Sequence, residues 1–132
     1  MALRKTTSIV YALLGVVYIL LGFAAILAPA GLLPQGLIDS FLGDETITPL
    51  MGHFLQEFGS VFVALGVIFI WYASRREPSP GFHWAVTFYF FINASIHWVG
   101  PSGFTDSWQS GTFNTIPFAL MLVLGILQRR AI

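Results

Sequence analysis

The chain has 132 residues, of which 56% are hydrophobic and only 9% are charged, and its formal net charge is zero. Soluble domains carry about 25% charged residues, so this chain lacks the charge that would cover a water-facing surface. The zero net charge leaves no basic footprint for a nucleic acid. The absence of cysteine excludes disulfides, thiolate metal sites and thiol redox chemistry.

The chain contains four apolar runs, at about residues 6–28, 50–74, 82–100 and 111–129. A bilayer core of roughly 30 Å needs about 20 helical residues to cross it. The first two runs meet this length comfortably, whereas the third and fourth are marginal. The pattern predicts an all-α fold, an integral membrane four-helix bundle that forms a single transmembrane domain over residues 1–132.

The first run has the basic start and the small-residue end that are typical of a signal peptide. Arg4 and Lys5 precede it, and the residues from Ala28 to Gly31 close it. However, its length of about 20 residues exceeds the usual 7–15-residue apolar core of a signal peptide. We therefore interpret it as a retained span, with cleavage after Ala30 as the alternative.

The loop at residues 30–48 is the longer of the two loops on the outer side. Four apolar residues recur in it at helical spacing, namely Leu37, Ile38, Phe41 and Leu42. This pattern is typical of a short helix on the bilayer surface, and a hydrophobic loop folded over the mouth of the bundle explains it equally well. Thr48 and Pro49 then predict the start of the second span, as its N-cap and its first helical residue.

The basic residues predict the orientation of the chain. All six lie on one side of a four-span arrangement, namely Arg4, Lys5, Arg75, Arg76, Arg129 and Arg130. The two opposite loops lack Lys and Arg and carry acids instead, namely Asp39, Asp44, Glu45 and Asp106. The positive-inside rule therefore predicts that both termini are cytoplasmic. The layout indicates a multi-pass protein of the cytoplasmic membrane of a prokaryote.

Tryptophans agree with this orientation. Trp71 and Trp84 fall at the inner boundary, and Trp98 and Trp108 fall at the outer boundary, as in an aromatic belt. His83 also lies at the inner boundary, and we interpret it as an interfacial polar residue.

Glycines seven residues apart mark one face of each of the first two spans. They are Gly15 and Gly22 in the first span and Gly52, Gly59 and Gly66 in the second. Seven residues are about two helical turns, so each row forms a smooth stripe, and small residues let spanning helices approach closely. We expect spans one and two to pack along these stripes in a left-handed crossing. The alternative is that one stripe faces a second copy of the protein.

Polar residues of three spans are expected near the outer ends of the helices. His53 and Glu57 are four residues apart on one face of the second span, as are Asn93 and His97 on the third. Asn114 lies near the start of the fourth. Glu57 lies about 13 Å along the helix axis from the predicted N-cap. An ionised carboxylate near mid-membrane costs about 3 kcal/mol or more, so Glu57 must be protonated, paired or hydrated.

Three functions fit this cluster, and the sequence leaves them open. The cluster could line a polar pocket in the outer leaflet half that binds a small amphiphile, a quinone or a lipid, or the chain could serve as an accessory subunit of a membrane complex. Alternatively, His53 and His97 could be the axial ligands of a b-type haem in an electron-transfer subunit, since they are expected at similar depth on adjacent antiparallel helices. The third possibility is a purely structural subunit, in which the cluster satisfies itself or a partner helix in a complex or homo-oligomer.

A metal site of two histidines and Glu57 ranks below haem, because no motif such as HExxH reinforces it. The predicted partners are thus the lipid bilayer and a membrane-protein complex or a second copy, without nucleic acid. Enzymatic activity stays open.

The first half of the chain carries a resemblance to a known group. The residues that carry it are Gly15, Gly22 and Pro29 in LLGVVYILLGFAAILAPAGL, and Glu57, Gly59 and Gly66 in the second span. Over residues 1–75 the chain resembles the DoxX-like group of small four-helix membrane proteins. The resemblance implies a link to quinone-dependent oxidation, which some members have, and it carries over Glu57 as a site residue. It does not extend to His53 and His97.

Overall fold

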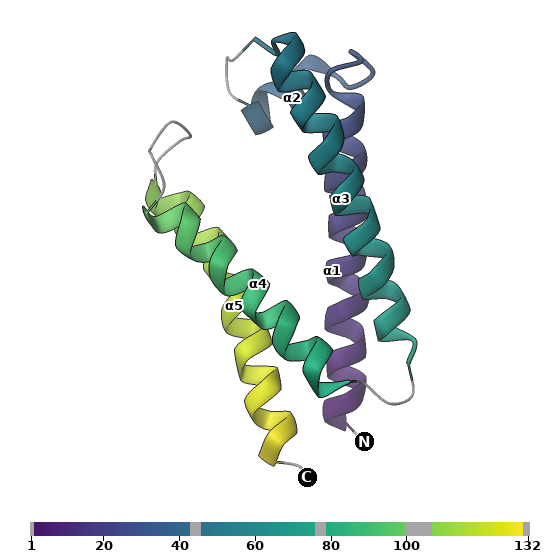
Figure 1. Cartoon of the computed structure of the whole chain (residues 1–132), viewed down its shortest axis with the longest axis vertical. Coiled ribbons are helices and arrows are strands. Elements are labelled where there is room, and N and C mark those ends of the chain that lie inside the picture. Colours follow the sequence, from purple (N-terminus) through teal and green to yellow (C-terminus); the bar gives the residue numbers. More distant parts are fainter. Residues whose placement is uncertain (1, 43–45, 76–78, 100–106, 131–132) are drawn as a thin grey trace. The chain divides into compact units, whose positions relative to one another are not determined.

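The computed structural model describes residues 2–42, 46–75, 79–99 and 107–130. Five helices follow one another in this part of the chain, and it contains no strand (Figure 1). They are α1 (Ala2–Leu27), α2 (Gln35–Leu42), α3 (Pro49–Ala73), α4 (Pro80–Val99) and α5 (Ser107–Arg130). The prediction of an all-α fold is confirmed.

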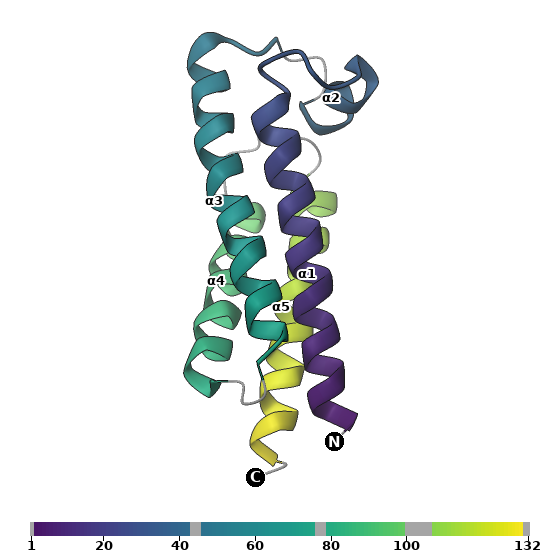
Figure 2. The same ribbon diagram turned by 90° about the vertical axis from the view of Figure 1, so that its right-hand side faces the viewer.

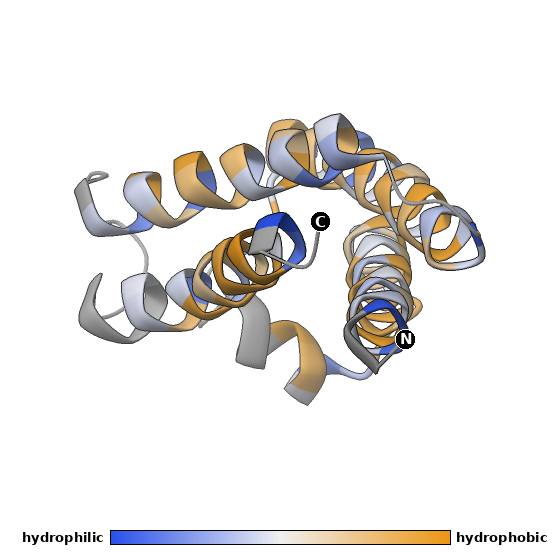
Figure 3. Cartoon of the chain, turned by 90° about the horizontal axis from the view of Figure 1, so that it is seen from below, coloured by the Kyte–Doolittle hydropathy of each residue, from blue (hydrophilic) through white to orange (hydrophobic). Residues whose placement is uncertain are grey.

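Three of these helices are long and apolar enough to cross a membrane, namely Arg4–Leu27, Pro49–Ala73 and Gly111–Arg129. This finding supports the prediction of a helical membrane protein. Figure 3 shows that hydrophobic residues cover most of the helical ribbon, whereas hydrophilic residues form short patches, including patches beside the two termini. The helix α4 has 20 residues but is less apolar, so the four-helix bundle and the cytoplasmic termini stay predictions.

The chain divides into two compact units. One is Thr6–Arg75, called here the α1–α3 unit, which also contains α2. The other combines Met1–Lys5 with Arg76–Ile132 and is called here the α4–α5 unit. The single transmembrane domain over the whole chain stays a prediction.

The turns of the α1–α3 unit follow from local chemistry. After α1, Gly31 adopts a φ of 66°, a left-handed conformation that glycine takes without steric cost. Its N–H donates to the carbonyl of Ala28, and the N–H of Leu32 donates to that of Leu27. This is the Schellman arrangement, in which a glycine after the last helical turn satisfies carbonyls that the helix leaves unpaired.

The start of α3 is capped as the sequence predicts. The Thr48 hydroxyl accepts a hydrogen bond from the Met51 N–H at 3.2 Å, and Pro49 lies in the first turn. Between α1 and α3, a helix α2 forms where apolar residues recur at helical spacing, and Ile38 is buried in it. The location of α2 on a bilayer surface stays a prediction.

The helices α1 and α3 run antiparallel and side by side, as both Figure 1 and Figure 2 show, and small residues set their separation. A Cβ atom added to Gly59 would lie 2.6 Å from the carbonyl oxygen of Gly22, and one added to Gly66 would lie 2.6 Å from that of Gly15. Only glycine permits such an approach of two backbones. The register pairs Gly15 with Gly66, Gly22 with Gly59 and Pro29 with Gly52.

Aromatic side chains pack beside this glycine contact. The ring of Tyr11, which is fully buried, lies 4.5 Å from that of Tyr72 and 5.9 Å from that of Phe69 between centroids. Tyr18 packs between Phe62 and Phe69, at 5.3 and 5.4 Å. Tilted and edge-on ring pairs of this kind stabilise a core by about 0.5–1.5 kcal/mol beyond the burial of area.

The helices α4 and α5 form the second antiparallel pair and contact each other along their lengths (Figure 2). Glycines again mark the closest approaches, because Gly111 lies under the ring of Trp98 and Gly125 lies under that of Trp84. The helix α5 continues through Pro117, and α4 is described as far as Val99.

Candidate functional site

The His53–Glu57 pair lies on α3, one turn apart. The Nε2 atom of His53 is 3.2 Å from Oε1 of Glu57, and the two side chains are 65% and 63% exposed. Glu57 precedes Gly59 by two positions, which is about 200° around a helix of 3.6 residues per turn. The pair therefore faces away from α1, and neither α1 nor α2 covers it.

Two more polar residues extend this surface. Gln56 and Ser60 are exposed, and the Ser60 hydroxyl donates to the Gln56 carbonyl at 2.9 Å. At 100° per residue, positions 53, 56, 57 and 60 fall within about 100° of the helix circumference. We call these four residues the polar face of α3. Phe54 and Phe58 are exposed beside it.

The predicted site residues of the other unit form a separate pair. The Asn93 amide nitrogen donates to the Asn114 side-chain oxygen at 2.8 Å, which links α4 to α5 in a partly buried position. His97 is exposed one turn further along α4. The structure thus joins His53 to Glu57 and Asn93 to Asn114. The two pairs belong to different units, and their convergence into one site stays a prediction.

The tryptophan near this end of α4 packs inside its own unit. The Trp98 indole N–H donates to the Thr115 hydroxyl at 2.9 Å, and that hydroxyl donates to the Gly111 carbonyl at 2.8 Å. A Cβ atom on Gly111 would lie 2.6 Å from the indole ring. Trp98 therefore closes the α4–α5 pair at this end, and Trp108, predicted at the same membrane boundary, has no described side chain.

His83, interpreted as an interfacial polar residue, has a fully buried side chain, so it faces α5 rather than an interface with water, and its depth in a membrane stays a prediction. Its Nε2 atom lies 2.9 Å from the carbonyl oxygen of Met121, and its own carbonyl accepts from the Thr87 hydroxyl at 2.9 Å. Gly125 makes room for the ring, since a Cβ atom there would lie 3.0 Å from Nε2.

The contact between His83 and α5 could have been predicted from the sequence. Asn93 and Asn114 are suited to an interhelical hydrogen bond, and in an antiparallel pair that bond sets the register of all other positions. The register brings residue 83 opposite residue 124 or 125, where Gly125 offers the space. A buried polar group without a partner is costly, so a histidine opposite a glycine predicts a hydrogen bond across the helix pair.

The described residues offer limited support for a metal site or a haem site. Within residues 2–42, 46–75, 79–99 and 107–130, no group of three or more His, Asp or Glu side chains is arranged to hold a metal ion. The haem alternative requires a ring nitrogen of His53 for the iron, and its Nε2 atom contacts Glu57. An iron at that atom would have to displace the carboxylate.

No known protein family, curated protein or solved structure matches the chain. The DoxX-like grouping therefore stays a prediction that rests on the residues quoted for it. The function has to be inferred from the chemistry of the chain's own side chains.

Proposed function

We propose that the chain is a small multi-pass membrane protein that binds the polar headgroup of a small amphiphile, a quinone or a lipid, on the polar face of α3. The observation that carries this proposal is the exposed His53–Glu57 pair. Glu57 lies eight residues after the start of α3 at Pro49, which is about 12 Å along the axis. An ionisable group at such a depth is costly in contact with hydrocarbon and usually faces protein, water or a ligand.

The chemistry of the pair suits a headgroup with carbonyl or hydroxyl oxygens. A carboxylate accepts hydrogen bonds, and a histidine both donates and accepts according to its tautomer. The exposed rings of Phe54 and Phe58 would flank a flat or apolar portion of the ligand. Asn93, His97 and Asn114 of the α4–α5 unit stay candidates for binding the same ligand, as the sequence predicts.

The arrangement in the membrane is part of the proposal. The helix α4 pairs with α5 along its length, so it would lie at the same depth as a span. Its polar residues Asn93 and His83 bond to α5, which removes much of their cost in lipid. We therefore propose four spans with both termini in the cytoplasm of a prokaryote.

Single introduced cysteines test this topology, because the chain has none of its own. We expect an impermeant thiol reagent added outside intact cells to label Gly36→Cys and to leave Ser74→Cys unlabelled. Both residues are exposed, and the proposal places them on opposite sides of the membrane. Labelling of position 74 but not of position 36 would reverse the orientation, and labelling of both would contradict the number of spans.

Glu57→Gln tests the binding function, because it keeps the shape of the side chain and removes its charge. We expect the affinity for a short-tailed benzoquinol or for phosphatidylethanolamine, each of which carries a hydrogen-bond donor for the carboxylate, to fall about 10-fold or more when measured in detergent. A hydrogen bond to a charged group contributes about 1.5–3 kcal/mol, and 1.4 kcal/mol is tenfold. The control is Glu77→Gln, the same substitution between α3 and α4, which should leave the affinity unchanged.

Two other results would each select an alternative function. If neither probe binds, Glu57→Gln is neutral and Glu57→Leu destabilises the protein by about 1–3 kcal/mol, the pair belongs to a structural or accessory subunit. A sharp Soret band in the visible spectrum of the purified protein, lost in both His53→Ala and His97→Ala, would establish the haem function instead.

A further inference from the structure

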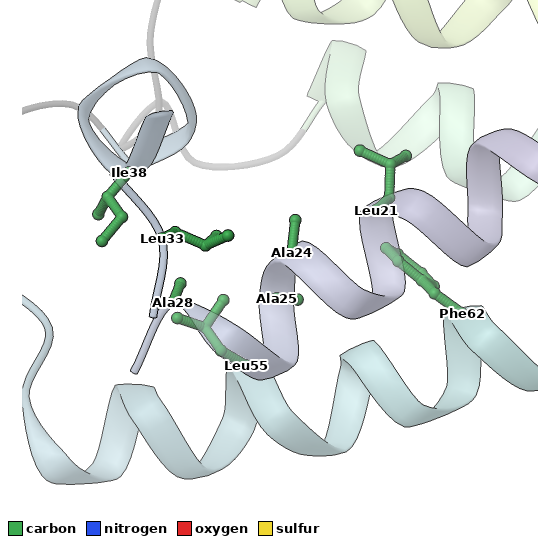
Figure 4. A pocket seen from close by; sticks show the side chains of 8 residues that line it. All are labelled: Leu21, Ala24, Ala25, Ala28, Leu33, Ile38, Leu55 and Phe62. Atoms are coloured by element: carbon green, nitrogen blue, oxygen red, sulfur yellow. The ribbon is translucent and has the colours of Figure 1, made fainter. Parts of the chain in front are cut away.

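A partly open cavity of about 190 Å³ lies within the α1–α3 unit, where α1, α3 and the segment with α2 meet (Figure 4). It is separate from the polar face of α3, because Leu55 lines the cavity and lies about 200° around the helix from Glu57. Its lining is apolar throughout and includes Leu21, Ala24, Ala28, Ile38, Leu55 and Phe62.

Small side chains on α1 create the hollow. Leu21, Ala24 and Ala28 follow one another at helical spacing and therefore lie on one face of α1, and two of the three are alanines. The glycine contact between Gly22 and Gly59 fixes the distance to α3 beside them, so the helices cannot move closer to fill the space. Figure 4 shows Leu33 and Ile38 closing the other side.

The apolar lining cannot bind a water molecule stably. A buried water needs about two to four polar partners, whereas an apolar cavity of roughly 150 Å³ in another protein stays dry and binds benzene. The present cavity is larger than that one and smaller than the roughly 300–1,000 Å³ of sites for drug-sized ligands. Its size therefore suits a short segment of one hydrocarbon chain.

The surroundings of α1 and α3 supply such a chain. Both helices are long and apolar enough to cross a membrane, and the solvent of a spanning helix is the hydrocarbon of the bilayer. We propose that this cavity binds the end of a single hydrocarbon tail, either an acyl chain of a phospholipid or an isoprenoid tail. This site goes beyond the headgroup site on α3 and requires only that α1 and α3 enter a bilayer.

Photolabelling tests the proposal on the full-length protein in micelles of digitonin, a steroid glycoside that has no acyl chain. The probe is a phosphatidylcholine that carries a diazirine at the end of one acyl chain. We expect saturable labelling that concentrates in residues 21–28 and 33–38. Ala24→Leu fills the cavity and should lower this labelling about tenfold, since about 1.4 kcal/mol of lost contact is a factor of ten. Ala119→Leu, at an exposed alanine of α5, is the matched control and should not change it.

Competitors identify the source of the tail. Suppression of the labelling by excess unlabelled phosphatidylcholine with no effect of farnesol supports the acyl chain, and the reverse result supports the isoprenoid tail. Unsaturable labelling spread over all apolar surfaces of α1 and α3 would overturn the proposal. Glu57→Gln should leave the labelling unchanged, so failure of this site and failure of the headgroup site can be told apart.

Thermal unfolding in detergent provides a second measurement. Added phosphatidylcholine should raise the unfolding midpoint of the wild type, and Ala24→Leu should raise it without lipid while removing the response to lipid. Ala28→Leu replaces Ala24→Leu if the latter does not fold. A variant that is stabilised but keeps the full response to lipid and the full labelling would show a packing void with no ligand, and the proposal would be wrong.

Discussion

Gly59→Leu should prevent α1 and α3 from packing together. A Cβ atom at this position would lie 2.6 Å from the carbonyl oxygen of Gly22 and 2.7 Å from Cγ1 of Ile26. The first of these atoms belongs to the backbone, so no rotation of a side chain relieves the clash. Overpacking alone costs about 1–3 kcal/mol, and the loss of the close contact along α1 adds to it. We expect almost no folded protein in detergent and a lower unfolding midpoint for any that remains.

The matched control is Gly36→Leu in α2. A Cβ atom at Gly36 would meet nothing within 4 Å, so this variant should keep the yield and midpoint of the wild type. Gly22→Ala should also destabilise the protein, because its Cβ atom would lie 2.6 Å from the carbonyl oxygen of Gly59. The double variant Gly22→Ala, Gly59→Ala should cost less than the sum of the two, since both clash at one contact. Wild-type stability of Gly59→Leu would disprove this account of the helix pair.

His83→Ala should strongly destabilise the α4–α5 unit. The side chain is fully buried and its Nε2 atom lies 2.9 Å from the Met121 carbonyl oxygen. The variant loses that hydrogen bond, about 0.5–1.5 kcal/mol, and leaves a cavity next to Gly125. Large-to-small substitutions of buried side chains cost about 2–5 kcal/mol, so we expect a fall of about that size in the free energy of unfolding.

His97→Ala is the control for this experiment, because it removes the same side chain from an exposed position of the same helix. Its effect on the unfolding midpoint should be much smaller. His83→Phe separates the two contributions, since it fills most of the volume and cannot bond to the Met121 carbonyl. If His83→Ala and His97→Ala are equally stable, the contact between His83 and Met121 does not hold α4 and α5 together.

The parts of the fold that follow from local rules could be predicted from the sequence. Thr48 caps α3 because a threonine before a proline and an apolar run offers its hydroxyl to the first free N–H groups. Helical spacing in the loop before it corresponds to α2. The polar pair of His53 and Glu57 follows from their spacing of four residues.

The parts that depend on how helices contact one another were harder to predict. The sequence does not show whether a histidine near a membrane boundary is exposed there or bonds to a neighbouring helix, so the buried contact of His83 could not be predicted from its position alone. The hydropathy of α4 is low because it counts Asn93 and His83 as polar residues. It takes no account of their hydrogen bonds to α5. The cavity beside Ala24 was not predicted at all, because it depends on the side chains of three segments at once.

The equal spacing of the glycine contacts has a consequence for how α1 finds its place on α3. Contacts recur every seven residues, as Gly15 with Gly66 and Gly22 with Gly59, so a slide of α1 by about 10 Å would again set glycine against glycine. The glycine contacts alone therefore do not distinguish the observed position of α1 from the shifted one. The contact of Tyr11 with Phe69 repeats in the same way, because Phe62 lies seven residues before Phe69. The contact between Tyr11 and Tyr72, at 4.5 Å, does not repeat, since Leu65 and Ser79 lie seven residues from Tyr72. This aromatic contact, rather than the glycines, selects one of the equivalent positions.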